Sequence, residues 1–197
     1  MSRIKKLELD DWDSELREMT AADSGTPLEQ GAMRMFAHSP EISKGLTKFA
    51  GSLKQNRSLP DRLVELVRLR VAFHNQCRSC MAIRYKDGQE DGITEDLVCS
   101  LEKPMEADNL SDAEKAAIQY GELFATNHLA INDDIYDNLR KHFNESEIVE
   151  LSMTVAFFVG FGRLAASYHM VEELPESFQA DEKETLTPWG NDSIIVR

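Results

Sequence analysis

Hydrophobic residues recur with helical spacing along most of the chain. In the segment of residues 59–74, "LPDRLVELVRLRVAFH", they cover most of the helix circumference, which is typical of the central helix of a bundle. Thr26 and Ser111 each begin a capping box, in which a Glu three residues later marks the first turn of a helix. No segment alternates apolar and polar residues as a strand does, except weakly the terminal "SIIVR". The pattern predicts helices over residues 26–38, 39–53, 59–74, 94–101, 111–125 and 144–171.

The helical segments predict an all-α fold, a bundle of about eight helices within one domain. We expect this domain to span residues 26–172 and to follow an N-terminal extension of residues 1–25. Residues 173–197 lose the helical periodicity and are expected to form an extended C-terminal arm. Trp189 and the apolar residues near the terminus would be unusual in a solvated tail. They predict that the arm docks on its own domain or on a neighbouring subunit.

Composition and charge narrow the classes of function. The 197 residues include 22 Lys and Arg against 35 Asp and Glu, which gives a net charge of −13. Without a basic cluster, this charge argues against nucleic acid and anionic membranes as partners. The N-terminus lacks the apolar run of a secretory signal, and the apolar stretch of residues 151–162 is too short to cross a bilayer. Together with only three cysteines, these features predict a cytoplasmic protein in a reducing compartment.

The stretch "FHNQCRSCMAIR" contains the candidate reactive residues of the chain, two closely spaced cysteines. Cys77 and Cys80 are three residues apart, close enough on one helical turn to form a disulfide. If Asn75 caps a new helix, Cys77 falls in its first turn, where the helix dipole stabilises a thiolate. Arg78 and Arg84 add positive charge nearby. This environment suits a cysteine pair that cycles between dithiol and disulfide.

The spacing alone leaves more than one interpretation of the cysteine pair. A structural zinc site needs four ligands, and the chain offers only the distant Cys99 and five scattered histidines besides the pair. We therefore expect no metal. A thioredoxin-type motif needs a strand–helix–strand context, which an all-helical chain lacks. A redox pair and an inert pair of small buried residues both remain open. Cys99 lies in the apolar context "LVCSL" and is expected to be a buried core thiol.

A polar arc on the predicted central helix leads toward the cysteines. Asp61, Glu65 and Arg68 share this arc, which points along the helix toward Cys77. Glu65 is therefore expected to be half-buried. A simpler interpretation is an ion pair between Glu65 and Arg68 at i,i+3 spacing, worth only about 0.2–0.5 kcal/mol if it is exposed.

The stretch "ELVRLRVAFHNQCRSCMAIRYKDGQEDGITEDLV" resembles the core of the carboxymuconolactone decarboxylase family, in particular its alkylhydroperoxidase AhpD-like branch. That branch carries a glutamate, eleven intervening residues, a CxxC and a histidine four residues later. Glu65, Cys77 and Cys80 match this spacing, and the likeness extends over about residues 39–169. The resemblance implies an all-α bundle that assembles as a trimer or a hexamer.

The resemblance also implies roles for the matching residues. Cys80 would attack a peroxide and become a sulfenic acid, and Cys77 would resolve it to a disulfide. Glu65 would belong to a proton relay that helps to deprotonate the thiols. No cofactor is implied; the partners are a small peroxide or disulfide substrate and an external dithiol that donates electrons.

The sequence departs from the branch at two positions. Histidines of the branch are replaced by Ser79 and Arg84, and an arginine cannot relay a proton in the physiological range. Arg84 is instead expected to hold Glu65 as an ion pair, or to stabilise a thiolate or an anionic substrate. His74, one turn before Cys77, is a candidate replacement for the missing histidine, with capping or packing as its alternative role.

Three functions therefore compete. The first is a thiol-dependent peroxidase or disulfide oxidoreductase that uses Cys77 and Cys80. The second is a lyase like the decarboxylase that names the family, acting on a small anionic substrate, although such lyases generally lack the dithiol. The third is a non-catalytic oligomer whose dithiol senses redox state.

Overall fold

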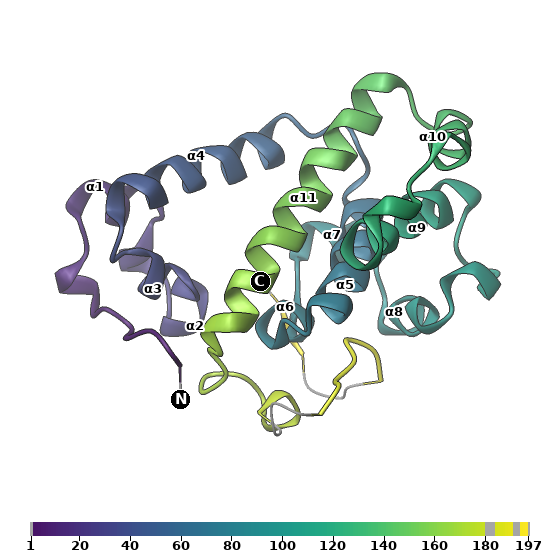
Figure 1. Ribbon diagram of the computed structural model, residues 1–197. Coiled ribbons are helices and arrows are strands. Elements are labelled where there is room, and N and C mark those ends of the chain that lie inside the picture. Colours follow the sequence, from purple (N-terminus) through teal and green to yellow (C-terminus); the bar gives the residue numbers. More distant parts are fainter. Residues whose placement is uncertain (1, 180–183, 191–193, 197) are drawn as a thin grey trace.

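The computed structural model describes residues 2–179, 184–190 and 194–196, and over these the fold is all-α, as predicted. Helix α5 lies at the centre and packs against α9 and α11, as Figure 1 shows. The helices are α1 (Ser14–Met19), α2 (Pro27–Gln30), α3 (Met33–Phe36), α4 (Pro40–Gln55), α5 (Asp61–Asn75), α6 (Arg78–Ala82), α7 (Lys86–Glu90), α8 (Glu95–Cys99), α9 (Asp112–Thr126), α10 (Asp133–Arg140) and α11 (Glu145–Tyr168). Short 3-10 turns cover Leu9–Asp11, Ala22–Ser24, Ser100–Glu102, Pro104–Glu106, His128–Ala130 and Glu176–Phe178.

The central helix is buried nearly all round, as its sequence predicts. Leu66, Leu69 and Val71 have no solvent exposure, and they join a core cluster with residues of α9 and α11. Glu65 and Arg68 on the same helix are only 3% and 6% exposed. Glu65 is thus fully buried rather than half-buried as expected, and the energy of an exposed ion pair does not apply to its pair with Arg68. Asp61, at the start of the same arc, remains partly exposed.

The number and the ends of the helices differ from the expectation. The described residues form eleven α-helices rather than about eight, because short helices flank the long ones. The predicted helix over residues 26–38 is split into α2 and α3 by Gly31, whose φ of +51° favours glycine. The last helix ends at Tyr168 because His169 adopts the left-handed conformation with φ +53°.

Helix α11 is longer than its apolar stretch suggested. It has 24 residues and, by length and composition alone, is long and apolar enough to cross a membrane. The apolar stretch of residues 151–162 forms only part of this helix. Such a helix is weak evidence for a membrane span, since the core helix of a bundle passes the same test. The contacts of α11 with α5 and α9 support its interpretation as a core helix.

The cysteine pair lies where α5 gives way to α6. Asn75 is the last residue of α5, not the cap of a new helix as predicted. Gln76 then takes the left-handed conformation with φ +49°, which turns the chain sharply, and Cys77 is the N-cap of α6. The five residues of α6 place Cys80 one turn after Cys77, on a short helix with a correspondingly small dipole.

The C-terminal arm docks on its own chain, over the segment that carries the cysteines. Strand β2 (Ile195–Val196) pairs in parallel with β1 (Ile83–Arg84), which follows α6 directly. Trp189 is 9% exposed and packs on the ring of Phe73, with ring centroids 4.9 Å apart. The weak strand signal of "SIIVR" is thus confirmed, and the arm lies beneath α6 in Figure 1.

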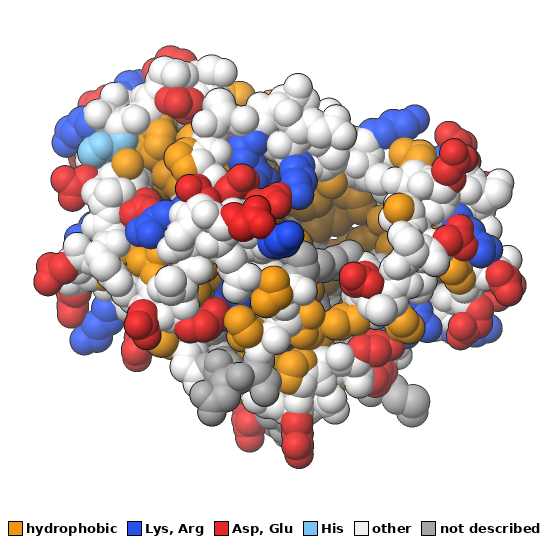
Figure 2. Space-filling model, turned by 180° about the vertical axis from the view of Figure 1, so that it is seen from behind, with side chains coloured by type: hydrophobic (Ala, Val, Ile, Leu, Met, Phe, Trp, Pro, Cys, Tyr) orange, Lys and Arg blue, Asp and Glu red, His pale blue; other side chains and the backbone are white. Residues whose placement is uncertain are grey.

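The N-terminal helices form a small core of their own. Trp12, Leu16, Ala22 and Ala37 make a buried cluster, and α1 packs against α4. A cavity of about 690 Å³ lies between part of these helices and α11, and its walls include Met33 of α3 together with two phenylalanines of α11. Figure 2 shows a hollow with a hydrophobic interior in this region, seen from behind.

Candidate redox site

The two cysteines of the CxxC are joined, but they lie in different surroundings. Cys77 and Cys80 form a disulfide with a Cα–Cα distance of 5.2 Å. Cys77 is completely buried, whereas Cys80 is half-buried and lines a partly open cavity. This difference means that a molecule in the cavity reaches Cys80 and not Cys77.

The cavity beside Cys80 measures about 210 Å³ and is mainly apolar. Its walls come from three separate parts of the chain, namely α2 and α3, the segment from α5 to Tyr85, and α11. Its few polar side chains belong to Arg68, Asn75, Ser79 and Tyr85. The apolar side chains are those of Leu28, Ala32, Phe36, Ala72, Ile83, Phe157, Phe158, Phe161, Ala165 and Met170.

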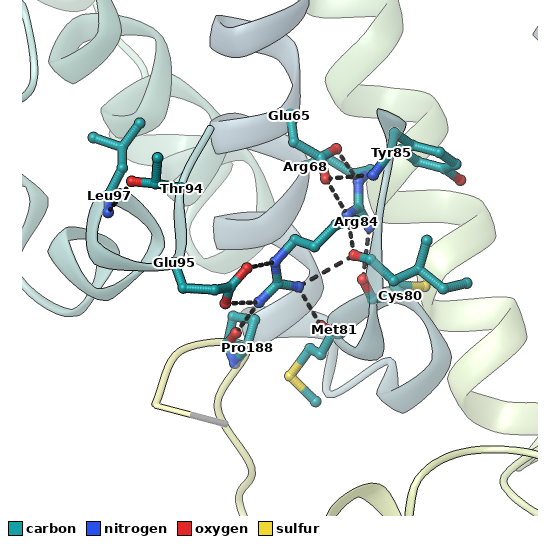
Figure 3. A network of polar contacts seen from close by, with 11 residues as sticks. Glu65, Arg68, Cys80, Met81, Arg84, Tyr85, Thr94, Glu95, Leu97 and Pro188 are labelled. Carbon is teal, nitrogen blue, oxygen red and sulfur yellow. Dashed lines mark hydrogen bonds and ion pairs between the residues drawn. The ribbon is translucent and has the colours of Figure 1, made fainter. Parts of the chain in front are cut away.

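A buried ion pair supports the cavity wall from behind. The guanidinium of Arg68 donates hydrogen bonds of 2.6 and 2.7 Å to the two carboxylate oxygens of Glu65. It also donates to the carbonyl oxygens of Cys80, at 2.6 Å, and Ile83, at 2.7 Å. Figure 3 shows Arg68 between the Glu65 carboxylate and the backbone of Cys80. The pair fixes the end of α6 to α5.

Two further contacts complete the surroundings of this pair. The backbone N–H of Tyr85 donates to Glu65 at 3.2 Å, and the Arg68 guanidinium lies 4.7 Å from the centre of the Tyr85 ring. Burial disfavours the charge of Arg68, but the Glu65 carboxylate more than offsets this and raises the pKa of Arg68 above its usual value. Arg68 therefore keeps its positive charge on the wall of the cavity that holds Cys80.

Arg84 has a different role from either of those expected. It is completely buried and pairs with Glu95 through two hydrogen bonds of 2.9 and 3.0 Å. It also donates to the carbonyl oxygens of Met81, at 2.8 Å, and of Pro188 in the arm. The prediction that Arg84 pairs with Glu65 is wrong, because Arg68 takes that place (Figure 3). Arg84 instead ties the arm and α8 to the turn after α6.

His74 is not brought to the thiols. Its Nε2 atom is buried and lies 3.6 Å from the Glu122 carboxylate, too far for a hydrogen bond. Its ring packs against Phe73, and it does not line the cavity beside Cys80. Burial lowers the pKa of His74 below its usual value, and the charge of Arg70 lowers it further. The geometry favours the packing role over replacement of the missing histidine.

The structure also shows where Ser79 and Cys99 lie. The hydroxyl of Ser79, at one of the missing histidine positions, lies 3.7 Å from Cys77 Sγ and also lines the cavity. Cys99 is exposed, so the prediction of a buried core thiol is wrong. The side chains that face the core from α8 are those of Leu97 and Val98. Cys99 follows them on the outer face of the helix.

The sequence did not indicate how several other residues contribute to this site. Arg68 was considered only as the partner of Glu65, and its contact with Cys80 depends on how α6 folds back on α5. Tyr85 had no signal beyond its proximity to the motif. The phenylalanines of α11 were visible as an apolar run, but the sequence alone does not indicate that Phe157 and Phe161 line the cavity with Cys80.

Among the described residues, no group of three or more His, Cys, Asp or Glu is placed to hold a metal ion.

Comparison with known proteins agrees with the fold and the motif. Residues 40–123 match the model of the carboxymuconolactone decarboxylase family. The uncharacterised protein YdfG of Bacillus subtilis is 28% identical over 102 residues, which are 51% of this chain and 69% of YdfG. The stretch that is similar to this family spans α4 to α9 and includes both cysteines.

Two solved structures share the fold of this chain. The alkylhydroperoxidase AhpD core of a peroxidase-related protein from Ralstonia eutropha superposes with a TM-score of 0.70 at 17% identity, over 94% of this chain and 98% of that one. A protein of unknown function from Agrobacterium tumefaciens, a candidate AhpD antioxidant defence protein, gives a TM-score of 0.58 at 22% identity, over 70% and 93%. The chain thus has an AhpD-like helical fold.

Proposed function

We propose that the protein is a thiol-dependent peroxidase that reduces organic hydroperoxides with Cys80 as its attacking residue. One observation carries this proposal: the disulfide partner that faces the cavity is Cys80, whereas Cys77 is fully buried behind it. A peroxide in the cavity meets the Cys80 sulfur first. Cys77, one helical turn away, is then in place to resolve the product.

The proposed reaction takes three steps. The Cys80 thiolate attacks the terminal peroxide oxygen, the O–O bond breaks, and an alcohol leaves after taking up a proton. The Cys77 thiol then attacks the Cys80 sulfenic acid, so that the disulfide forms and water leaves. An external dithiol reduces this disulfide by exchange and is itself oxidised. The steps together convert one hydroperoxide and one dithiol into an alcohol, water and a disulfide.

The walls of the cavity support an organic substrate over hydrogen peroxide. An apolar pocket favours an alkyl or aryl group, because transfer of apolar surface from water to the pocket is favourable. Phe36, Phe157 and Phe161 supply aromatic surface for such a group. Arg68 is a fixed positive charge on the same wall, and although its donors are engaged by Glu65 and backbone carbonyls, its charge favours the Cys80 thiolate through space.

Glu65 is proposed to act through Arg68. Its carboxylate is engaged by the guanidinium and by the Tyr85 N–H, and Arg68 stands between it and Cys80. Glu65 is accordingly a positioning residue, which holds the cation that faces the cavity. This assignment replaces the direct relay of a proton that the family resemblance implied.

The lyase alternative finds less support in the geometry. Arg84 was its candidate for binding an anionic substrate, but it is fully buried and engaged by Glu95 and by backbone carbonyls. The guanidinium of Arg68 is likewise committed to Glu65 and two carbonyls. No observation favours the lyase specifically, so it is not proposed.

Turnover measurements test the peroxidase. Cumene hydroperoxide or hydrogen peroxide is supplied in excess with dithiothreitol as the external dithiol, and peroxide consumption is followed. We expect sustained turnover that is faster with cumene hydroperoxide, its loss in Cys80→Ser, and unchanged rates in the control Cys99→Ser. Consumption no faster than that by free cysteine would refute the proposal, and a single turnover without recycling would favour the redox sensor.

A further inference from the structure

The cavity beside Cys80 adjoins the larger cavity between the N-terminal helices and α11. The larger cavity measures about 690 Å³ and lies in the region of the hollow seen in Figure 2. Among the described residues, six line both cavities and mark where the two spaces adjoin: Gly31, Ala32, Phe36, Tyr85, Phe157 and Phe161. A molecule that binds beside Cys80 therefore has further space in continuation of its own cavity.

Aromatic rings form much of the boundary between the two cavities. Phe36 and Phe161 are in edge contact with ring centroids 6.5 Å apart, and the ring of Phe157 lies 5.0 Å from that of Phe161. Phe49 of α4 contacts Phe157 of α11 at 5.9 Å, which joins these two helices at the same place. The rings offer apolar surface that leads from the Cys80 cavity into the larger one.

Several polar side chains line the larger cavity, but their donors are engaged close by. The hydroxyls of Thr20, Ser24 and Thr47 each donate a 2.8 Å hydrogen bond to a backbone carbonyl three or four residues earlier. Gln30 donates to two backbone carbonyls of the segment before α2, at 3.1 and 3.2 Å. Because these donors are already paired, the cavity suits an apolar group better than a ligand that needs new hydrogen bonds.

We propose that the larger cavity binds the tail of the substrate, so that the preferred substrate is an uncharged, long-chain alkyl hydroperoxide. This inference rests on the proposed function, since it names the substrate class of the same site. The cavity beside Cys80 is smaller than the range of about 300–1,000 Å³ that is typical of pockets for small organic ligands, whereas the larger cavity falls within it. The peroxide group meets Cys80, and the chain extends past the phenylalanine rings.

Chain length is therefore the property that the two cavities together select. Each methylene that moves from water into an apolar cavity improves binding by up to about fourfold. A butyl group is short enough to stay beside Cys80, whereas a decyl group extends into the larger cavity. The reaction at Cys80 is the same for both, and the product is the corresponding alcohol.

Helix α4 offers a matched pair of variants. Gly51 lines the larger cavity and lies four residues after Thr47, on the same face of the helix, and an added Cβ would meet nothing within 4 Å. Gly45 is exposed on the same helix and is not among the described residues that line the cavity, and an added Cβ there also meets nothing within 4 Å. Gly51→Leu fills part of the cavity, and Gly45→Leu is the control.

Binding of the product alcohols tests the tail site without any turnover. 1-Decanol and 1-butanol are titrated calorimetrically into the protein in the oligomeric state that it has in solution. We expect 1-decanol to bind at least about a hundredfold more tightly than 1-butanol, because six further methylenes leave water. We expect Gly51→Leu to weaken binding of 1-decanol by at least about tenfold, the contribution of about two methylenes, and Gly45→Leu to leave it unchanged.

Turnover then tests the substrate class. The ratio of kcat/KM for n-decyl hydroperoxide to that for n-butyl hydroperoxide is measured with dithiothreitol as the reductant. We expect a high ratio in the wild type and in Gly45→Leu, and a ratio at least about tenfold lower in Gly51→Leu.

The outcomes separate this inference from the peroxidase proposal. If 1-decanol does not bind, as when a second copy of the chain fills the hollow, or if both variants weaken it equally, the inference is overturned. An active peroxidase whose kcat/KM does not depend on chain length would also overturn the inference alone. Binding of 1-decanol that only Gly51→Leu weakens, without any consumption of peroxide, would support the tail site and refute the peroxidase.

Discussion

Arg68 donates a 2.6 Å hydrogen bond to the carbonyl oxygen of Cys80, which joins the buried helix α5 directly to the cysteine that faces the cavity. The same guanidinium is held by Glu65, twelve residues before Cys77 in the sequence. The spacing between the glutamate and the CxxC thus has a physical reason. It lets α6 fold back so that its carbonyl groups meet the cation on α5.

The buried ion pair predicts a large loss of stability in Glu65→Gln. This change leaves the Arg68 charge buried without a counter-charge, and we expect it to cost about 3–5 kcal/mol in free energy of unfolding. Urea denaturation of the wild type and the variant measures this cost. Glu90→Gln is the control, because Glu90 forms an exposed pair with Lys86 and should change stability by less than about 0.5 kcal/mol. Equal effects of the two changes would contradict this role of Glu65.

Two glycines of α11, of which Gly162 lines the cavity beside Cys80, give a matched prediction about packing. A Cβ at Gly162 would lie 2.5 Å from Nδ2 of Asn75, whereas a Cβ at Gly160 would meet nothing within 4 Å. We expect Gly162→Ala to destabilise the protein by about 1–3 kcal/mol through overpacking, and Gly160→Ala to stabilise it by about 0.5–1 kcal/mol. Thermal denaturation of both variants checks this, and a stabilising Gly162→Ala would show that Asn75 does not pack there.

Much of the fold follows from local patterns that the sequence displays. Thr26, Ser111 and Asn144 begin helices with capping boxes because their side chains and a Glu three residues later satisfy free backbone N–H groups. The central position of α5 follows from its apolar circumference. The break at Gly31 was not predicted, because a glycine inside a helical pattern is compatible with either continuation or a turn.

The arm predicts a change in the protection of Cys77. Truncation after Gln179 removes Leu186, Pro188, Trp189 and strand β2, which cover the segment with the CxxC. In the reduced protein, we expect alkylation of Cys77 to become at least about tenfold faster, because local opening then costs at least about 1.4 kcal/mol less. Mass spectrometry of alkylated peptides measures the rate. The exposed Cys99 is the internal control, and an unchanged Cys77 rate would show that the arm does not protect it.

His74 predicts a specific dependence of stability on pH. Burial lowers its pKa in the folded state below the usual value of 6.5. Above pH 6.5 the histidine is neutral in both states; as pH falls below 6.5, the unfolded chain binds the proton first, so the folded state loses stability. The loss is at most about 1.4 kcal/mol per pH unit. Urea denaturation at pH 7.5 and 5.5 should show a smaller decrease for His74→Gln than for the wild type, and equal decreases would contradict the account.

Only the residues of the motif itself could be predicted from the sequence. Cys77, Cys80 and Glu65 could be identified by spacing, but their surroundings depend on contacts between distant segments. Arg84 is an example: its partners are Glu95 on α8 and Pro188 in the arm, and no local pattern connects these positions. The apolar cavity is likewise assembled from three parts of the chain, so its presence beside Cys80 follows only from the tertiary structure.

The most direct test of the central claim is to find which cysteine forms the sulfenic acid. Reduced Cys77→Ser and Cys80→Ser proteins, each also carrying Cys99→Ser, are treated with one equivalent of cumene hydroperoxide and trapped with dimedone for mass spectrometry. The account predicts a dimedone adduct on Cys80 in the Cys77→Ser protein, and none above background on Cys77 in the Cys80→Ser protein. An adduct on Cys77, or no adduct on either cysteine, would contradict the assignment of Cys80 as the attacking residue.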